Sequence, residues 1–155
     1  MALLGLLPLA AQAQNLPSEG PIDSDFTWTE KQQTMPTAGG RDAFSAESML
    51  VITATNPASI LDKLAGRCLT LGEQDPDGGN YSMVGTCTLS DADGDQIFEQ
   101  IESTAGDGKA KLTGGTGKFE GITGEYRFTN VYYGSPSEDV SQGAGHKQGH
   151  YKFVR

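Results

Sequence analysis

The sequence has few of the residues that usually reveal a chemical function. It holds two cysteines, Cys68 and Cys87, and two histidines, His146 and His150, which lie far from the cysteines in the sequence. Structural zinc sites use four such ligands at close spacing, so we predict no metal site. No serine lies in a nucleophile elbow and no cofactor fingerprint occurs, so we also expect no cofactor. A histidine in a solvated loop is more common than a catalytic one, and we assign no role to either histidine.

Basic residues are scarce, and long apolar runs are missing. The chain has 11 Lys and Arg against 20 Asp and Glu, a net charge of -9. Nucleic acids and anionic membrane surfaces both attract basic patches. The longest apolar run has about ten residues, whereas a membrane-spanning helix needs about 20. We therefore expect no nucleic-acid partner and no membrane insertion.

The N-terminal segment is apolar and ends in Ala11-Gln12-Ala13, the small-x-small pattern that precedes signal-peptide cleavage. No Lys or Arg precedes Lys31, so the basic start of a signal peptide is missing. Either the true start lies upstream, or the segment is not a signal peptide. We expect a signal peptide at 1–13, a flexible lead-in at 14–25 and one domain at 26–155. The protein would then be periplasmic or secreted.

Glycine is abundant, with 21 residues that mostly stand in short clusters between apolar runs. This pattern indicates many turns and many short strands. We expect loops at 35–44 and 134–149, and a short turn of helix at 58–64 that places Ile60, Leu61 and Leu64 over one end of the sheet. Eight strands are expected: 26–33, 48–55, 67–71, 81–89, 96–102, 109–113, 124–133 and 150–154.

The two cysteines are placed symmetrically about the Asp77-Gly78 pair. If Asp-Gly forms the tip of a hairpin, Cys68 and Cys87 face each other across it. Opposed residues of an antiparallel pair are close enough for a disulfide, which an exported protein would form. Two buried free thiols are the alternative.

The segment Thr113–Gly124 reads Thr-Gly-Gly-Thr-Gly-Lys-Phe-Glu-Gly-Ile-Thr-Gly, with five glycines in twelve residues. Phe119 and Ile122 stand three apart, which suits one tight helical turn held against a core between two strands. Gly117-Lys118 superficially resembles a phosphate-binding loop. That loop needs an earlier glycine where Leu112 stands and a hydroxyl residue where Phe119 stands, so we favour a structural corner.

The run Asp91-Ala-Asp-Gly-Asp95 superficially resembles a calcium loop. Its glycine is fourth rather than sixth, and no helices flank it. A tight Asp-Gly turn explains the aspartates more simply.

Hairpin-like connections between eight short strands favour an all-β, antiparallel barrel over a sandwich, because the last strand can pair with the first and remove both edges. Side chains along a barrel strand point alternately inward and outward, and we take the side that carries the aromatic residues as the interior. It predicts a ligand-binding set of Trp28, Phe98, Gln100, Phe128, Asn130, Tyr132 and Tyr151. The carboxylates Glu30 and Glu102 share this parity and are the candidate catalytic residues; Arg127 falls on the outer parity. Alternatively, both carboxylates lie at strand ends in water.

Three segments together resemble the allene oxide cyclase barrel-like family, small eight-stranded β-barrels similar to plant dirigent proteins. They are Cys87–Asp95, Leu112–Gly124 and the terminal aromatic strand. The resemblance covers about residues 26–155 and suggests a bacterial member. It implies the barrel fold. The catalytic glutamate of the plant enzymes cannot be assigned to a residue of this sequence, because no matching motif is found around it. It also implies that a homo-oligomer can form.

Two functions are compatible with these features. The first is an exported barrel that binds an apolar small molecule or has a structural role. The second is a cofactor-free isomerase or cyclase that acts on an apolar unsaturated substrate, as the resemblance implies.

Overall fold

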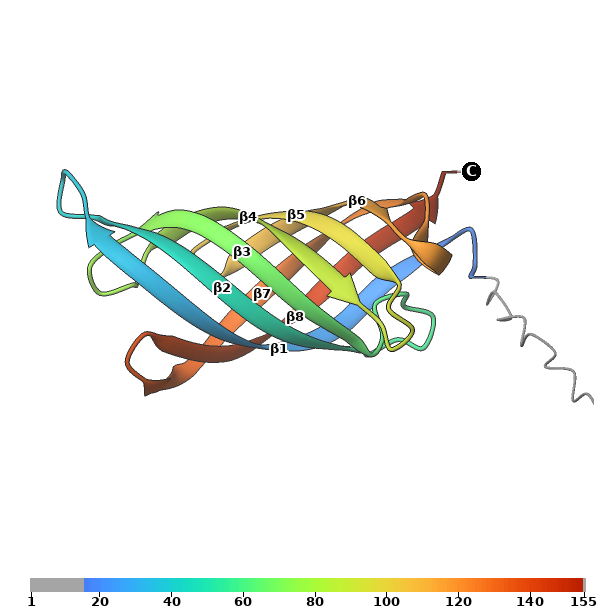
Figure 1. Cartoon of the computed structure of the whole chain (residues 1–155), viewed down its shortest axis with the longest axis horizontal. Helices are drawn as coiled ribbons and strands as arrows, with labels where there is room; N and C mark the ends of the chain where they lie inside the picture. Colours follow the sequence, from blue (N-terminus) through green and yellow to red (C-terminus); the bar gives the residue numbers. More distant parts are fainter. Residues whose placement is uncertain (1–15, 155) are drawn as a thin grey trace, which may run out of the picture.

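Eight antiparallel strands close into a barrel in the computed structural model, which describes residues 16–154 (Figure 1). Each strand pairs with its neighbours in the sequence, and the last strand pairs with the first, which confirms the predicted closure. The strands are β1 (Glu19–Pro36), β2 (Asp42–Ala54), β3 (Leu64–Gln74), β4 (Tyr81–Ser90), β5 (Gln96–Thr104), β6 (Asp107–Gly115), β7 (Ile122–Ser137) and β8 (Val140–Phe153).

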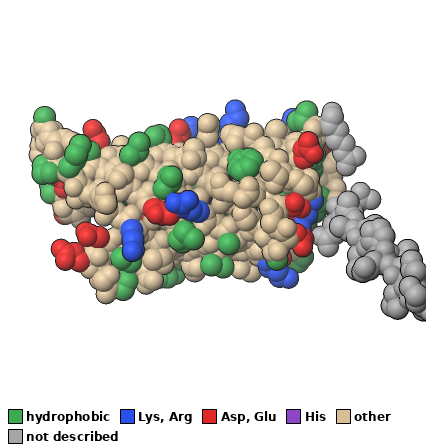
Figure 2. All heavy atoms as spheres, in the orientation of Figure 1, with side chains coloured by type: hydrophobic (Ala, Val, Ile, Leu, Met, Phe, Trp, Pro, Cys, Tyr) green, Lys and Arg blue, Asp and Glu red, His purple; other side chains and the backbone are tan. Residues whose placement is uncertain are grey.

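Burial alternates along the strands, as expected for a sheet with one face inside a barrel. In β1 the inward residues Ile22, Ser24 and Phe26 are buried, whereas Asp25 and Thr27, on either side of Phe26, are exposed. The outer surface mixes charged, polar and apolar side chains, and on the face shown in Figure 2 the apolar ones form small separated groups. The hydrophobic core is therefore the inside of the barrel.

The two ends of the barrel differ. One end, which we call the mouth, carries the four hairpin turns at 37–41, 75–80, 105–106 and 138–139, on the left in Figure 1. The other end, the closed end, carries the connections at 55–63 and 91–95, the short 3-10 helix η1 (Gly117–Phe119) and the beginning of β1. Fully buried aliphatic side chains fill the barrel near the closed end: Ile22, Ile52, Leu61, Leu64, Leu89, Ile97, Leu112 and Ile122.

The connection at 55–63 closes this end without a helix. Ile60, Leu61 and Leu64 are buried there, as predicted, but the helical turn expected at 58–64 is wrong. Ser24 Oγ donates to the carbonyl oxygen of Leu61 at 2.6 Å and lies 2.8 Å from Ser59 Oγ. These bonds to the barrel wall take the place of local helical hydrogen bonds, so the segment follows the wall instead.

The glycine corner forms the predicted tight turn. Helix η1 buries Phe119, and Ile122 begins β7 in the core. Gly117 has a φ of +54°, and its Cα faces the carboxylate of Asp95 so closely that a Cβ would collide with it. A glycine is therefore required at this position.

The aspartates of the 91–95 turn hold this corner to the barrel. Lys118 Nζ pairs with Asp91 at 2.5 Å and with Asp93 at 3.0 Å, and the Lys118 amide donates to Asp95. Asp91 Oδ1 also accepts the amides of Asp93 and Asp95. Although burial opposes the shift, the hydrogen bond from Lys118 and these amides lower the pKa of Asp91. The lysine and aspartates are thus engaged in structural contacts.

Three segments predicted as irregular are strands. The flexible lead-in predicted at 14–25 ends by Glu19, where β1 begins, and Ile22 and Ser24 within it are fully buried. The loop predicted at 35–44 is a short turn, because β2 begins at Asp42. The long polar loop predicted at 134–149 is a hairpin in which β7 and β8 continue to within two residues of each other.

Candidate functional site

The half of the barrel nearest the mouth is hollow. A cavity of about 690 Å³ opens between the hairpin turns and is lined by β1–β5, β7 and β8. Its walls are largely aromatic and aliphatic, with Phe26, Trp28, Phe44, Leu50, Ile101 and Phe128 among them. The aliphatic core of the closed end lies beneath it. The cavity is thus a blind chamber with one opening.

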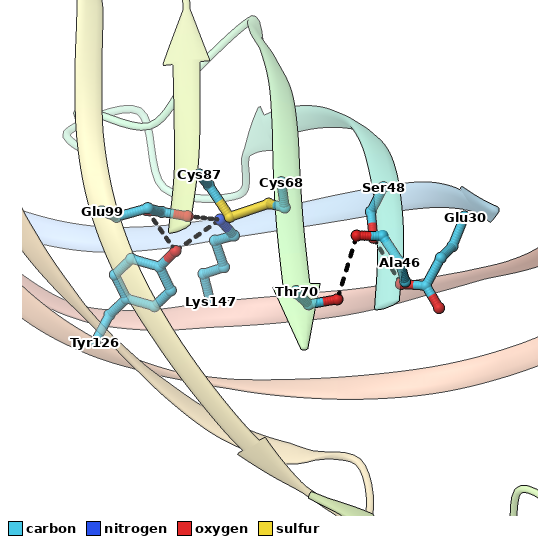
Figure 3. Close-up of a disulfide and its surroundings, with 9 residues drawn as sticks. All are labelled: Glu30, Ala46, Ser48, Cys68, Thr70, Cys87, Glu99, Tyr126 and Lys147. Carbon is cyan, nitrogen blue, oxygen red and sulfur yellow. Dashed lines mark hydrogen bonds and ion pairs between the residues drawn. A yellow bond between two sulfur atoms is a disulfide. The ribbon is translucent and has the colours of Figure 1, made fainter. Parts of the chain in front are cut away.

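Three polar side chains from three strands meet at the floor of this cavity (Figure 3): Glu99 of β5, Tyr126 of β7 and Lys147 of β8. Tyr126 Oη donates to Glu99 Oε2 at 2.7 Å. Lys147 Nζ donates to Tyr126 Oη at 2.7 Å and lies 3.4 Å from Glu99 Oε1. All three residues are at most 3% exposed. We call them the floor triad.

Burial shifts the pKa values of Tyr126 and Lys147. It raises the pKa of Tyr126 well above its ordinary value of 10.0, and the neighbouring Glu99 carboxylate adds to this effect. The phenol therefore stays neutral and can donate to the carboxylate. Burial lowers the pKa of Lys147, and Glu99 opposes that shift by attraction and by hydrogen bonding. A buried charge is stable only when it is paired in this way.

A second polar pair lies higher on the cavity wall. Ser48 of β2 donates to Glu30 Oε2 of β1 at 2.6 Å, and the two residues are directly opposed in the β1–β2 ladder. Burial raises the pKa of the Glu30 carboxyl, and the hydrogen bond from Ser48 partly offsets this effect. A carboxyl with a raised pKa retains its proton to higher pH and can act as an acid.

The disulfide lies in the cavity wall beside the floor triad. Cys68 and Cys87 are directly opposed in the β3–β4 ladder and are bonded to each other, as predicted from their spacing about the Asp-Gly turn. Cys87 is also opposed to Glu99 in the β4–β5 ladder (Figure 3). The disulfide therefore fixes two of the strands that form the cavity.

Four of the predicted ligand-binding residues and one predicted catalytic residue line the cavity: Trp28, Phe128, Asn130, Tyr132 and Glu30. Their inward parity is correct, and their roles stay predictions. Tyr151 also points inward but is buried near the closed end, where its ring packs against Phe153 and beside Gly20.

The parity predicted for β5 is wrong. Phe98, Gln100 and Glu102 project outward, and Glu102 pairs on the surface with Lys109 at 2.5 Å. They do not line the cavity. The prediction took the aromatic Phe98 to face inward. Instead, Ile97 and Ile101 on the opposite face of β5 are the apolar residues that point into the barrel.

Sequence reasoning missed all three members of the floor triad, although Tyr126 shares the inward parity predicted for Phe128. Glu99 stands between Ile97 and Ile101. These apolar residues, each two positions away, indicate that Glu99 faces the inside of the barrel. Lys147 falls in a segment read as a loop, yet it shares parity with Gly143, Gly145, Gly149 and Tyr151. A strand with inward glycines was the signal that could have placed this lysine inside.

His146 lies on the outer surface beside β1. Its Nδ1 is 2.8 Å from Asp25 Oδ1, and its Nε2 is 3.4 Å from Asp23 Oδ1. It therefore has no access to the cavity. Within residues 16–154, no helix has both the length and the apolar character needed to cross a membrane.

Comparison of the sequence with protein-family models and with curated proteins gives no match. Comparison of the structure finds the same fold in solved dirigent proteins. The pterocarpan synthase dirigent protein GePTS1 is 12% identical, with a TM-score of 0.54 over 96% of this chain and 100% of that one. The pterocarpan synthase dirigent protein PsPTS1 is 10% identical, with a TM-score of 0.49 over 88% of this chain and 97% of that one. This protein has the dirigent-like barrel fold.

Proposed function

We propose that the barrel binds an apolar small molecule in the cavity at its mouth. The observation that carries the proposal is a chamber of about 690 Å³ with aromatic walls, an opening between the hairpin turns and a floor of three polar groups. Small-molecule sites commonly occupy about 300–1,000 Å³ and combine apolar walls with a few convergent polar groups. The comparison supports a small-molecule role only indirectly, because the structure with a similar fold is that of a pterocarpan synthase.

The proposal is tested with phenylnaphthylamine, a neutral probe whose fluorescence rises when it enters an apolar site. Met83 lines the cavity, whereas Val84 beside it on β4 projects outward. Met83→Trp therefore narrows the cavity, and Val84→Trp adds the same ring outside it. We expect M83W to weaken binding and V84W to retain it. Equal binding by both variants, or no binding by the wild type, would refute the proposal.

A cofactor-free isomerase or cyclase is the second candidate function, and Glu30 is the observation that favours it. This carboxyl lies within the cavity wall, and its pKa is raised by burial. It could protonate an epoxide oxygen of an unsaturated substrate as a general acid. We expect Glu30→Gln to retain probe binding and to lose any turnover of an apolar unsaturated epoxide. Turnover that survives in E30Q would exclude this role for Glu30.

We also propose that the protein is exported. The Cys68–Cys87 disulfide supports this, since such bonds persist mainly in oxidising compartments. The signal peptide expected at 1–13 lies outside the described residues. Export predicts a mature N-terminus at Gln14 in the periplasmic or secreted fraction, which N-terminal sequencing would reveal. An uncleaved chain in the cytoplasmic fraction would contradict it.

A further inference from the structure

The lysine of the floor triad has an unused hydrogen-bond donor. Within residues 16–154, its ammonium has two acceptors, Tyr126 Oη at 2.7 Å and Glu99 Oε1 at 3.4 Å. An ammonium carries three N–H groups. The rings of Phe26 and Tyr126 lie 5.3 and 4.8 Å from Nζ, and they stabilise the charge without accepting a conventional hydrogen bond. One donor therefore remains at the floor of the cavity.

The other two members of the triad need no partner from a ligand. Tyr126 donates its one proton to Glu99 and accepts from Lys147. Each Glu99 oxygen accepts one of these bonds. The polar group that a ligand must supply at the floor is therefore an acceptor.

The charge balance excludes a carboxylate as that acceptor. Glu99 already balances Lys147, so the triad has no excess positive charge. Burying an unpaired charge is strongly unfavourable. A neutral oxygen accepts the hydrogen bond without this cost.

From these observations we infer that the ligand is a neutral, apolar carbonyl compound, and that its carbonyl oxygen accepts a hydrogen bond from Lys147 Nζ at the cavity floor. The aromatic walls hold the apolar body of such a compound, and the mouth admits it carbonyl first. Glu99 and Tyr126 act as positioning residues that fix the amine. The inference rests on the proposed binding function and deepens it by naming the ligand class.

The test uses the full chain and three fluorescent probes that share a dimethylaminonaphthalene ring. The first is Prodan, a neutral ketone whose emission moves to the red when its carbonyl accepts a hydrogen bond. The second is the naphthoate, an anion, and the third is the parent amine without a carbonyl group. We expect the wild type to bind Prodan at least about tenfold more tightly than either analogue, because a hydrogen bond from a charged donor to a neutral acceptor contributes this much. Tighter binding of the naphthoate would overturn the inference.

Two variants locate the donor. Lys147→Met removes it, and the double variant E99M/K147M removes it without leaving Glu99 as an unpaired buried charge. In both variants we expect Prodan binding to fall about tenfold and its bound emission to move to the blue, whereas binding of the parent amine stays within about threefold. If K147M does not fold, the double variant alone decides the question. The carbonyl stretch of bound Prodan should also rise in frequency in the double variant.

Failure of the inference and failure of the proposed function give different results. If phenylnaphthylamine binds the wild type more tightly than M83W, and Prodan binds the wild type and E99M/K147M equally, the cavity binds apolar molecules without using Lys147. If neither probe binds the wild type, the proposed function itself is wrong. A wild-type preference for Prodan that disappears with Lys147 supports both.

Discussion

Gly145 of β8 lies directly opposite Phe26 of β1, and the phenyl ring of Phe26 occupies the space that a side chain at position 145 would need. A Cβ there would stand 2.4 Å from the ring and 2.1 Å from the carbonyl oxygen of Thr129. The same relationship joins Gly143 to Trp28, whereas a Cβ at Gly149 would meet the Cα and Cβ of Tyr126 on β7. Strand β8 thus makes room for the aromatic walls of the cavity.

Gly145→Ala should therefore destabilise the barrel. The added methyl group collides with a ring and with a backbone atom that cannot rotate away, and overpacking of this kind costs about 1–3 kcal/mol. The free energy of unfolding from urea denaturation measures the effect. The matched control is Gln148→Ala on the exposed side of β8, which should change stability by less than about 0.5 kcal/mol. Equal stability of the two variants would contradict the role of Gly145.

These glycines explain the largest error of the sequence-based prediction. Glycine usually indicates turns, so the segment 134–149 was predicted as a loop. Its inward glycines instead alternate with outward residues and stand opposite aromatic residues of β1 and β7. The large partner lies far away in the sequence, and only the closed barrel brings the two together. Local propensity could not reveal this pairing, although a period of two in the glycines was visible.

The cysteines and the glycine corner were predictable because their signals are local. Cys68 and Cys87 pair across a hairpin whose tip is marked by an Asp-Gly pair in the sequence, and the corner needs only Gly117 and Phe119, two residues later. The floor triad combines residues from β5, β7 and β8, and its discovery required the correct parity of all three. Phe98 misled this assignment on β5. The fold class was therefore accessible from the sequence, and most of the polar site was not.

The disulfide should contribute measurably to stability. It closes a loop with a sequence separation of 19 residues, for which restriction of the unfolded chain gives about 3 kcal/mol. The double variant C68A/C87A should therefore unfold at a lower urea concentration than the oxidised wild type. Adding dithiothreitol should destabilise the wild type and leave the variant unchanged. A variant as stable as the oxidised wild type would show that the disulfide does not stabilise the fold.

Glu30 should make stability depend on pH. Burial raises the pKa of this carboxyl in the folded protein above its ordinary value of 4.5, so the folded state binds a proton that the unfolded chain has released. Its favourable contribution is complete below pH 4.5 and is lost as the pH rises through the folded-state pKa.

Glu30→Gln removes this titration and still offers Ser48 an acceptor. The stability of E30Q relative to the wild type should therefore increase as the pH rises from about 4 towards neutrality, as measured by urea denaturation across that range. Glu102→Gln is the control, since Glu102 is exposed on the outer face and pairs with Lys109. A difference between E30Q and the wild type that stays constant with pH would show that Glu30 has the same pKa in both states.

The floor triad should show strong coupling between Glu99 and Lys147. Either single change, Glu99→Met or Lys147→Met, leaves the partner as an unpaired buried charge, and we expect each to cost about 3–5 kcal/mol. The double variant E99M/K147M removes both charges and fills the space with apolar atoms, so its cost should be well below the sum of the two. Urea denaturation at neutral pH measures all four proteins. Additive costs would mean that the two charges do not stabilise each other. Strong coupling would mean that an apolar floor makes the protein almost as stable as the polar one. A polar floor that adds little stability is expected if its role is to recognise a ligand.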